Sequence, residues 1–475
     1  MTLSRREFLA AAGAAAAPRE NARRLLLDSR VIERATGAKL VPGTLKKEPR
    51  PLFVEDKPWE PRFDNLYANV LYDPRDRLYK CWYSPFIVDP MTANTPRERR
   101  KEVKWHVSAN PQLEMGICYA TSRDGLNWRK PELGLVEFNG SRANNLILRA
   151  DAENGEPHGA GIALDPRDPD PSRRYKLVFN WFHRKVPRTD PRYRCMCVGF
   201  SPDGLRWDIR PAREMQAPGD THNNWFWSPA RNAYVCITRL VEDQRLVARS
   251  ESPDFLHWSK AEVILRGELQ RQTYAMPSFR HGNVYLGLLM LLNRNGRYDT
   301  VDCELAWSPD TLRWERIAPG TPFIPRGPEG SHDSKCIFGA FHPVVLDEEI
   351  RVYYGGNNGE HTDFRDGFFC LGRLRPDGFA AMTPESGAPA EIVTRPLAVG
   401  AALKVNAEAA GGALTAAVID GENRTLAESE PLRGDAVSAA LRWKTRGGLA
   451  ALRGRTARLR FRLERSRLYS FEFSV

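Results

Sequence analysis

The sequence lacks the long apolar runs and the one-sided charge that would indicate a membrane or a nucleic-acid partner. No apolar run approaches the roughly 18 residues that a membrane-spanning helix needs, and 27% of the 475 residues are charged. The net charge is +11, but lysine and arginine are interleaved with acidic residues and form no basic tail. We therefore expect a soluble protein of two or three domains, with no membrane span and no nucleic-acid partner.

Sequence motifs for cofactors and clustered metals are also missing. The eight cysteines form no Cys-x-x-Cys pair, and most lie in strand-like runs such as YKCWY, so we interpret them as buried thiols. Cys81 and Cys118 are the one pair for which we consider a disulfide. The nine histidines are dispersed, and no glycine-rich loop follows a strand and opens a helix. We expect no cofactor and no metal site, although a single central ion such as calcium stays an alternative.

The first 20 residues resemble a twin-arginine export signal. Arg5 and Arg6 precede a Phe-Leu pair and a short alanine-rich stretch that offers Ala-x-Ala cleavage sites. An alanine-rich N-terminal helix is the alternative interpretation. Export predicts a periplasmic or secreted protein, in which residues 21–57 form an N-terminal arm that holds most of the helix in the chain.

One heptapeptide, Ser-x-Asp-x-Leu-x-Trp, recurs along the chain. Short strands rich in β-branched and aromatic residues separate the copies, together with Asp-Pro turns such as YDPRD and LDPRD. Such strands between turn residues predict antiparallel four-stranded sheets, repeated radially as the blades of a β-propeller. In each blade the Asp suits the turn between the third and fourth strands, and the Trp can pack between neighbouring blades. The copies are SRDGLNW (122–128), SPDGLRW (201–207), SPDFLHW (252–258), SPDTLRW (308–314) and a degenerate RPDGFAA (375–381).

Residues 58–385 resemble the five-bladed propeller glycoside hydrolases of families 32, 43, 62, 68 and 117. The resemblance lies in the blade repeats and in KPWE…DNLYANVLYDP followed by YATSRDGLNWRKP. After residue 389 the composition becomes Ala/Gly-rich, and residues 390–475 look like the β-sandwich that family 32 enzymes carry. The WMNDPNG-like start and the Glu-Cys acid motif of family 32 are absent, so specificity for sucrose or fructans is not implied.

The resemblance implies an all-β fold, a five-bladed β-propeller followed by a C-terminal β-sandwich. It also implies a secreted glycoside hydrolase that cleaves an external polysaccharide or oligosaccharide. The alternative function is a non-catalytic propeller that binds carbohydrate or serves as a scaffold, because a fold does not determine a function.

Glycoside hydrolysis uses two carboxyl groups on opposite sides of the scissile bond. The first strand of each blade lines the central funnel, so we expect the functional side chains at the starts of these strands. The catalytic candidates are Asp64, Asp220, Glu329 and Asp333. The candidates for substrate binding are Arg62, Asn65, Glu156, His158, His222, Asn223, Tyr274, Arg326 and His332.

By position, the resemblance implies that Asp64 is the base or nucleophile. The place of the acid-orienting Asp in blade two holds Glu156 and His158, and the place of the acidic Glu in blade three holds Asp220 and His222. Enzymes of the family 117 type can use a histidine as the acid, so both histidines are alternatives for that role.

Two further alternatives accompany this assignment. The acid would be Glu329 or Asp333 if blade five supplied it. Asp64 and Asp220 would be mere turn caps if they bound only backbone amides.

If Asp220 is the acid, its position close to Trp225 and Trp227 predicts a raised carboxyl pKa. The glycine-rich GGNNGEH (355–361) is either a hairpin turn or a rim that contacts sugar.

Overall fold

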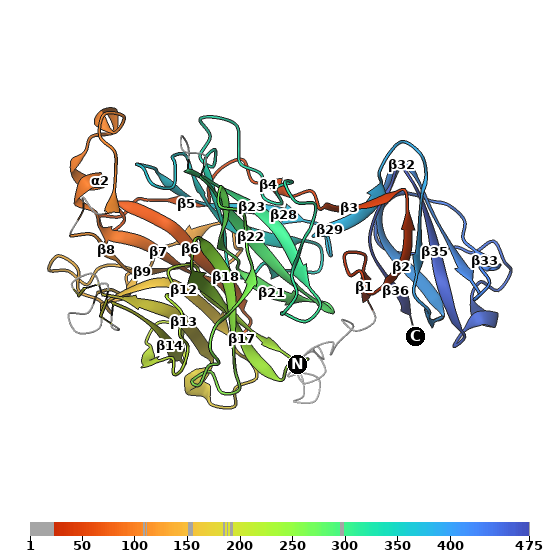
Figure 1. Cartoon of the computed structure of the whole chain (residues 1–475), viewed down its shortest axis with the longest axis horizontal. Helices are drawn as coiled ribbons and strands as arrows, with labels where there is room; N and C mark the ends of the chain where they lie inside the picture. The colour runs from red at the N-terminus through yellow and green to blue at the C-terminus, as the bar shows by residue number, and fades with distance from the viewer. Residues whose placement is uncertain are drawn as a thin grey trace, which may run out of the picture. The chain divides into compact units, whose positions relative to one another are not determined.

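The computed structural model describes residues 23–107, 110, 112–150, 155–183, 186–187, 189–190, 193–294 and 299–474. The export signal expected over residues 1–20 lies outside them. The described residues form two compact units (Figure 1): one spans Pro42–Phe379, and the other combines residues 23–41 with residues 380–474. No described helix is both long enough and apolar enough to cross a membrane.

The unit Pro42–Phe379 is a propeller of five four-stranded antiparallel blades. Blade one contains β6 (Arg62–Asp73), β7 (Leu78–Val88), β9 (Ile117–Ser122) and β10 (Trp128–Arg129), with β8 (Glu114–Met115) and β11 (Leu146–Leu148) paired alongside. Blade two contains β12 (Glu156–Leu164), β13 (Tyr175–Phe182), β14 (Arg194–Ser201) and β15 (Asp208–Pro211). Blade three contains β16 (Asn224–Ser228), β17 (Ala233–Val241), β18 (Arg245–Ser252) and β19 (Glu262–Leu265).

Blades four and five have interrupted first strands and touch through one parallel bridge between Val301 and Cys336. Blade four contains β20 (Arg271–Ala275) and β21 (Ser278–His281), then β22 (Val284–Arg294), β23 (Asp299–Ser308) and β24 (Glu315–Arg316). Blade five contains β25 (Cys336–Gly339) and β26 (Val344–Val345), then β27 (Ile350–Asn357), β28 (Gly367–Leu374), β4 (Lys46–Lys47) and β5 (Phe53–Val54).

The outer edge of blade five comes from the beginning of the chain, because β4 and β5 both pair with β28. Blade five also joins blade one directly: the Tyr353 hydroxyl donates to the Gly125 carbonyl at 2.9 Å, and Phe341 N–H donates to the Ala68 carbonyl at 2.8 Å. The segment expected as an arm over 21–57 therefore closes the propeller ring, and the propeller begins at residue 42 rather than 58.

The same segment corrects the expectation of helix. Its described part holds strands, whereas the described helix is limited to α2 (Pro90–Asn94) and short 3-10 turns at Arg97–Arg99, Pro171–Arg173 and Ala450–Leu452. Strands of two to five residues are too short for an alternating pattern to reveal them in a sequence.

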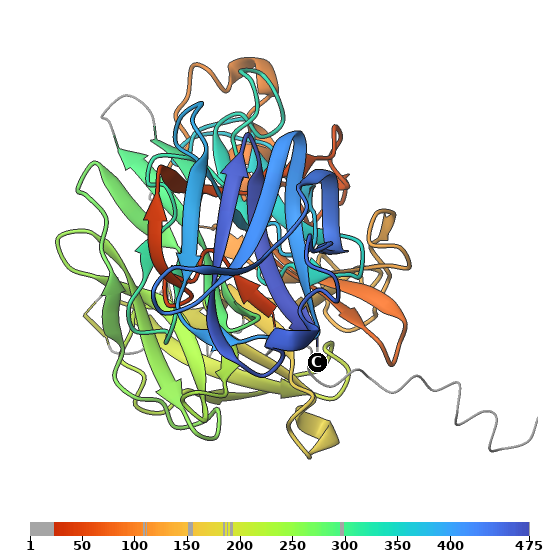
Figure 2. The same cartoon turned by 90° about the vertical axis from the view of Figure 1, so that its right-hand side faces the viewer.

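The second unit is a sheet that wraps around its own apolar core, and Figure 2 shows its red N-terminal strands beside the blue C-terminal ones. Its longest strand, β32, changes partner midway: residues 402–408 pair with β36 and residues 413–419 pair with β35. A side chain at Gly412 would collide with the Glu464 carbonyl, 1.8 Å from its Cβ position. Its strands are β1 (Arg23–Leu25), β2 (Ile32–Thr36), β3 (Ala38–Pro42), β29 (Ala380–Pro384), β30 (Ala390–Thr394), β31 (Leu397–Ala398), β32 (Ala402–Ile419), β33 (Thr425–Glu428), β34 (Leu432–Ala440), β35 (Thr456–Glu464) and β36 (Arg467–Ser474).

The all-β prediction of a five-bladed propeller followed by a β-sandwich is therefore confirmed. The second unit begins at residue 380 rather than 390 and takes in β1–β3 as well. The prediction of a disulfide between Cys81 and Cys118 is wrong. Cys81 lies opposite Ala120 and Cys118 lies opposite Tyr83, so the two thiols are out of register, and all eight cysteines are free.

The repeated heptapeptide forms the same hydrogen-bonded turn in each of its four full copies. In SPDGLRW, the Ser201 hydroxyl accepts the Gly204 N–H at 2.8 Å, and the Asp203 carboxylate accepts the next two backbone N–H groups at 2.8 and 3.0 Å. The fourth residue of every copy has a left-handed backbone, with φ between 69° and 79°. Trp128 packs edge-on against Phe369 of blade five, with ring centroids 5.5 Å apart, as expected for a contact between blades.

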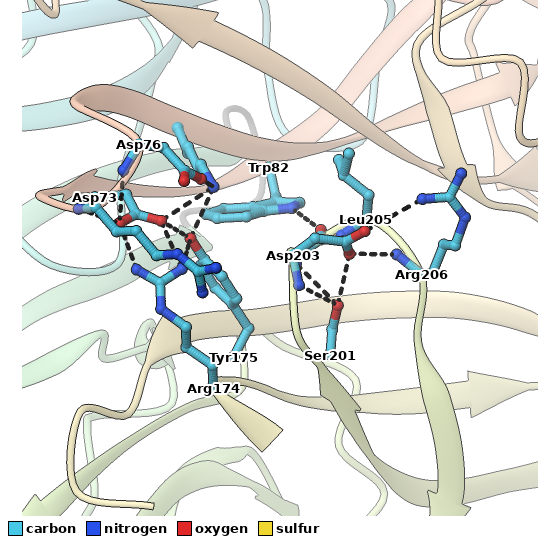
Figure 3. A network of polar contacts seen from close by, with 12 residues as sticks. Asp73, Asp76, Trp82, Arg174, Tyr175, Ser201, Asp203, Leu205 and Arg206 are labelled. Carbon is cyan, nitrogen blue, oxygen red and sulfur yellow. Dashed lines mark hydrogen bonds and ion pairs between the residues drawn. The ribbon is translucent and has the colours of Figure 1, made fainter. Parts of the chain in front are cut away.

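The Asp-Pro turns also join neighbouring blades (Figure 3). Asp73 of YDPRD accepts a hydrogen bond from Arg174 at 2.8 Å and another from the Tyr175 hydroxyl, both from blade two. Burial alone would raise the pKa of Asp73, but hydrogen bonds from Arg174 and Tyr175 outweigh it and lower the pKa. Asp165 of LDPRD accepts the Tyr234 hydroxyl of blade three at 2.6 Å in the same way. The sequence repeat is thus a repeat of blade-to-blade contacts.

Gly204 provides a test of this joint, because its carbonyl accepts the Trp82 indole N–H of blade one at 2.7 Å. A left-handed alanine costs about 1–2 kcal/mol wherever it stands. At Gly204 the new Cβ would also lie 2.6 Å from the Trp82 ring, whereas at Gly134 (φ +68°) it would meet nothing within 4 Å. We expect Gly204→Ala to destabilise the propeller by roughly 1–3 kcal/mol more than Gly134→Ala. Urea unfolding of both variants measures their free energies of unfolding. Equal losses of stability would contradict the contact between Gly204 and Trp82.

Candidate active site

A cavity of about 670 Å³ lies in the propeller, and all five blades contribute to its wall. The residues come from the first strands of blades one, two and four, from later strands of blades one, two and three, and from the connections that follow β7, β13, β15 and β27. Six of the residues predicted from the sequence line this cavity: Arg62, Asp64, Asn65, His158, Asp220 and Tyr274.

An irregular backbone in β6 presents two consecutive side chains to the cavity. Successive residues of a regular strand point to opposite faces of the sheet, yet Asp64 and Asn65 both line the cavity. The pairing of β6 with β7 shifts register on either side of Leu66, and Leu66 and Tyr67 have φ values of 59° and 40°. Left-handed backbone at bulky residues is strained and tends to occur at functional sites.

Asn65 is the centre of a hydrogen-bond network that connects blades one, four and five. Its amide donates to the hydroxyls of Tyr67 at 2.8 Å and Tyr274 at 2.9 Å, and its carbonyl accepts from Arg365 at 2.7 Å. The Tyr274 hydroxyl also lies 2.7 Å from His361 Nε2. These contacts fix the side chain next to Asp64, since Arg365 also lies 3.7 Å from an Asp64 carboxylate oxygen.

Asp220 and His158 form a second charged group in the same cavity. His158 Nε2 lies 2.9 Å from one Asp220 carboxylate oxygen, and Arg194 Nη2 lies 3.0 Å from the other. Burial would raise the pKa of Asp220, but His158 and the charges of Arg239 and Arg194 outweigh it and hold the pKa well below its usual value. Asp220 is therefore a carboxylate at neutral pH, not a proton donor.

The raised pKa that we expected for Asp220 is therefore wrong, because Trp225 and Trp227 do not line the cavity. The Trp225 ring packs against Phe255, with centroids 4.9 Å apart, and the Trp227 ring lies under the Arg167 guanidinium. Arginine and histidine surround Asp220 in place of these two tryptophans.

Three other predicted residues are buried beside the cavity without lining it. The Glu156 carboxylate accepts the Met115 N–H at 2.8 Å, and the Asn223 amide donates to the Gly159 carbonyl at 2.9 Å. Burial lowers the pKa of His222 to about 3, so this imidazole is neutral and cannot serve as an acid. Their contacts support the backbone between blades.

The four candidates from blade five lie elsewhere. Gly327 N–H donates to the Asp333 carbonyl at 3.1 Å, so the chain folds back on itself before β25 begins. The side chains bind their neighbours instead of substrate: Glu329 pairs with Lys335 and is exposed, Asp333 pairs with Lys47, Arg326 pairs with Asp302, and His332 packs against Phe368.

Sequence reasoning missed most of the positive charge in the cavity. The missed lining residues include four arginines, one histidine and one tryptophan: Arg194, Arg239, Arg245, Arg365, His361 and Trp105. None of them stands on a first strand, where we expected the site. His361, at the end of GGNNGEH, is the one residue with a sequence signal. The described residues contain no group of three or more His, Cys, Asp or Glu side chains that could hold a metal ion.

No family model and no curated protein matches the sequence. Among solved structures, an N-acetylgalactosamine deacetylase from F. plautii is 15% identical, with 70% of this chain and 95% of that chain covered and a TM-score of 0.48. A family 43 arabinoxylan arabinofuranohydrolase from Bacillus subtilis is 10% identical, with 90% and 99% covered and a TM-score of 0.41. A family 32 β-fructofuranosidase from Bombyx mori is 12% identical, with 90% and 94% covered and a TM-score of 0.42.

The solved structures similar to this chain thus include propeller glycoside hydrolases of families 43 and 32. At these identities and TM-scores, none of the similarities says what the cavity does. Its chemistry has to come from the residues that line it.

Glu55 supports the start of β6 and provides a pH test of the site's framework. One carboxyl oxygen accepts the N–H groups of Phe63 at 2.5 Å and Gly367 at 3.1 Å, which ties β6 to β28. Burial raises the pKa of Glu55 from 4.5 to about 8, and the charge of Asp366 adds to the rise.

Between pH 4.5 and 8 the folded chain therefore holds a proton on Glu55 that the unfolded chain releases. This contribution to stability is complete below pH 4.5 and is lost as the pH rises to about 8. We expect Glu55→Gln to flatten the decline of unfolding free energy over this range, measured by urea unfolding. The matched control is Glu329→Gln at an exposed carboxyl. If the unfolding free energies of the wild type and Glu55→Gln declined with pH at the same slope, the raised pKa of Glu55 would be contradicted.

Proposed function

We propose that this chain is a secreted glycoside hydrolase that cleaves an external polysaccharide or oligosaccharide in the propeller cavity. One observation carries the proposal: Asp64 lines the same cavity as the His158–Asp220 pair, although the three residues come from three blades. Hydrolysis of a glycosidic bond requires a base or nucleophile and an acid that face one substrate. A binding module has no need of such a pair.

Asp64 is the base or nucleophile in this proposal. Its carboxylate lines the cavity, and the backbone irregularity after it and the Asn65 network hold its position. A positioned carboxylate either activates water or attacks the anomeric carbon, depending on its distance from the acid.

His158 is the proton donor, and Asp220 positions it. Asp220 cannot donate because it stays ionised, while the imidazole lies 2.9 Å from it. His158 Nδ1 lies against the Met115 sulfur, so Nε2 is the nitrogen beside Asp220. Both ring nitrogens thus have neighbours, so the leaving oxygen takes the place of the Asp220 oxygen at Nε2 and receives the Nε2 proton, which leaves a neutral imidazole protonated at Nδ1. Until then the Asp220 carboxylate, which also binds Arg194, compensates the charge of the protonated imidazole. The acid is thus a histidine, an arrangement that the resemblance to family 117 also implied.

Substitutions at these residues test the proposal on a glycan that a screen identifies as a substrate. Acid–base steps typically contribute at least about a hundredfold to the rate. We expect Asp64→Asn and His158→Gln each to lower kcat by roughly this factor or more, and Asp220→Asn to lower it as well. Glu329→Gln is the matched control outside the cavity and should keep the wild-type rate.

Two outcomes would contradict the proposal. If a glycan is hydrolysed and both Asp64→Asn and His158→Gln keep near-normal rates, the assigned site is wrong. If glycans bind to the wild type and none is turned over, the chain is a carbohydrate-binding module.

Secretion has its own test, which rests on Arg5 and Arg6. Twin-arginine signals depend on this pair, so replacing both arginines by lysine should leave the uncleaved precursor in the cytoplasm. Cell fractionation and the molecular mass of the product measure this. Unchanged processing in the double variant would contradict export by this route.

A further inference from the structure

The cavity contains far more positive charge than a neutral sugar requires. Five arginines line it, against the carboxylates Asp64 and Asp220. Arg194 lies 3.0 Å from Asp220, and Arg365 lies 3.7 Å from Asp64. Within the described residues, the other three have no carboxylate at ion-pair distance: Arg62, Arg239 and Arg245.

Arg62 is the most unusual of these side chains. It is 1% exposed, and its guanidinium lies 3.9 Å from the centre of the Trp105 ring. None of its three guanidinium nitrogens has a hydrogen-bond partner in the described part of the chain. A buried, unpaired charge is strongly destabilising. Burial and the nearby charge of Arg365 lower the pKa of Arg62 to about 9, which reflects the same cost.

Other donors beside Arg62 are also unused. Arg365 uses Nη2 for Asn65, but its Nε and Nη1 are without a partner among the described residues. Arg239 uses Nη2 for the Tyr274 carbonyl, and its Nε is likewise unpartnered. His361 contacts Tyr274 through Nε2 and leaves Nδ1 without a partner.

These groups lie close enough together to act on one another. Burial lowers the pKa of His361 well below its usual value, and the charges of Arg365, Arg245, Arg239 and Arg62 all act in the same direction. The geometry agrees: the Arg239 and Arg245 guanidinium groups lie 4.5 and 5.7 Å from the centre of the Tyr274 ring, whose hydroxyl lies 2.7 Å from His361 Nε2. Planar guanidinium groups with free N–H donors bind carboxylate and sulfate oxygens in a bidentate manner.

We propose that the substrate is an anionic glycan, whose carboxylate or sulfate group binds to Arg62 and Arg365 with Arg239 and His361 alongside. This inference rests on the proposed function and names the substrate class of the same site. Since Arg365 also contacts Asp64, the acidic group belongs to a sugar next to the scissile bond. A uronic acid offers carboxylate oxygens to these donors and a sulfate ester offers sulfate oxygens, so both fit as anionic hydrogen-bond acceptors.

Calorimetric titration with matched sugars tests the proposal without requiring turnover. The probes are glucuronate, glucose 6-sulfate and glucose, together with galacturonate, galactose 6-sulfate and galactose. We expect one acidic class to bind roughly 10- to 100-fold more tightly than its neutral counterpart, as charge-assisted hydrogen bonds would give. The comparison of the uronates with the sulfated sugars shows which of the two acidic groups the site binds. If no acidic sugar binds better than its neutral partner, the proposal is overturned.

Arg62→Met separates a ligand-binding role from a structural one. Because it removes an unpaired buried charge, this variant should unfold at a higher urea concentration than the wild type and lose the preference for the acidic sugar. Arg266→Met is the control, since Arg266 is partly exposed and pairs with Asp243 at 2.8 Å. It should change neither property. An Arg62→Met variant that folds, is destabilised and keeps the preference would overturn the proposal. The comparison of sugars stays decisive if the variant does not fold.

The two proposals fail in different ways. Hydrolysis of a neutral glycan without any preference for acidic sugars would overturn the anionic substrate and leave the glycosidase in place. Tight binding of an acidic sugar by a protein that cleaves no glycan would overturn the glycosidase and support the anion site.

Discussion

The pairing of β28 with β4 and β5 is the constraint on which the rest of the propeller depends. It places residues from the beginning of the chain at the outer edge of the last blade and so completes the ring. A cavity between five blades exists only while the ring is closed. The same closure brings Asp64 and Asn65 from blade one next to Tyr274 from blade four and Arg365 from blade five.

The contacts between blades explain why the sequence repeats itself. Each Ser-x-Asp turn satisfies its own backbone N–H groups, and each Asp-Pro turn presents a carboxylate to a tyrosine of the next blade. These features are local in sequence, so the fold was predictable from the sequence alone. The short strands β4 and β5 were not, because they have too few residues for a pattern and acquire their role only from β28.

The residues of the candidate site were predictable only where they stand at or near the first strand of a blade. Asp64, Asn65, His158 and Asp220 stand at or near first strands, which converge by symmetry, and the cavity contains all four. Glu329 and Asp333 were misplaced because the chain turns back before β25. Arg239, Arg245, Arg365 and His361 come from later strands and a connection, whose paths depend on tertiary packing. Most of the positive charge of the site was therefore invisible in the sequence.

The central claim is that Asp64, His158 and the arginines act on one bound glycan. A crystal structure of the Asp64→Asn variant with an oligosaccharide that the wild type hydrolyses is the most direct test. We predict that the glycosidic oxygen lies within about 3.2 Å of His158 Nε2 and that an acidic group contacts Arg62 and Arg365. A glycan bound outside this cavity, or one whose glycosidic oxygen lies away from both His158 and the substituted side chain at position 64, would contradict the account.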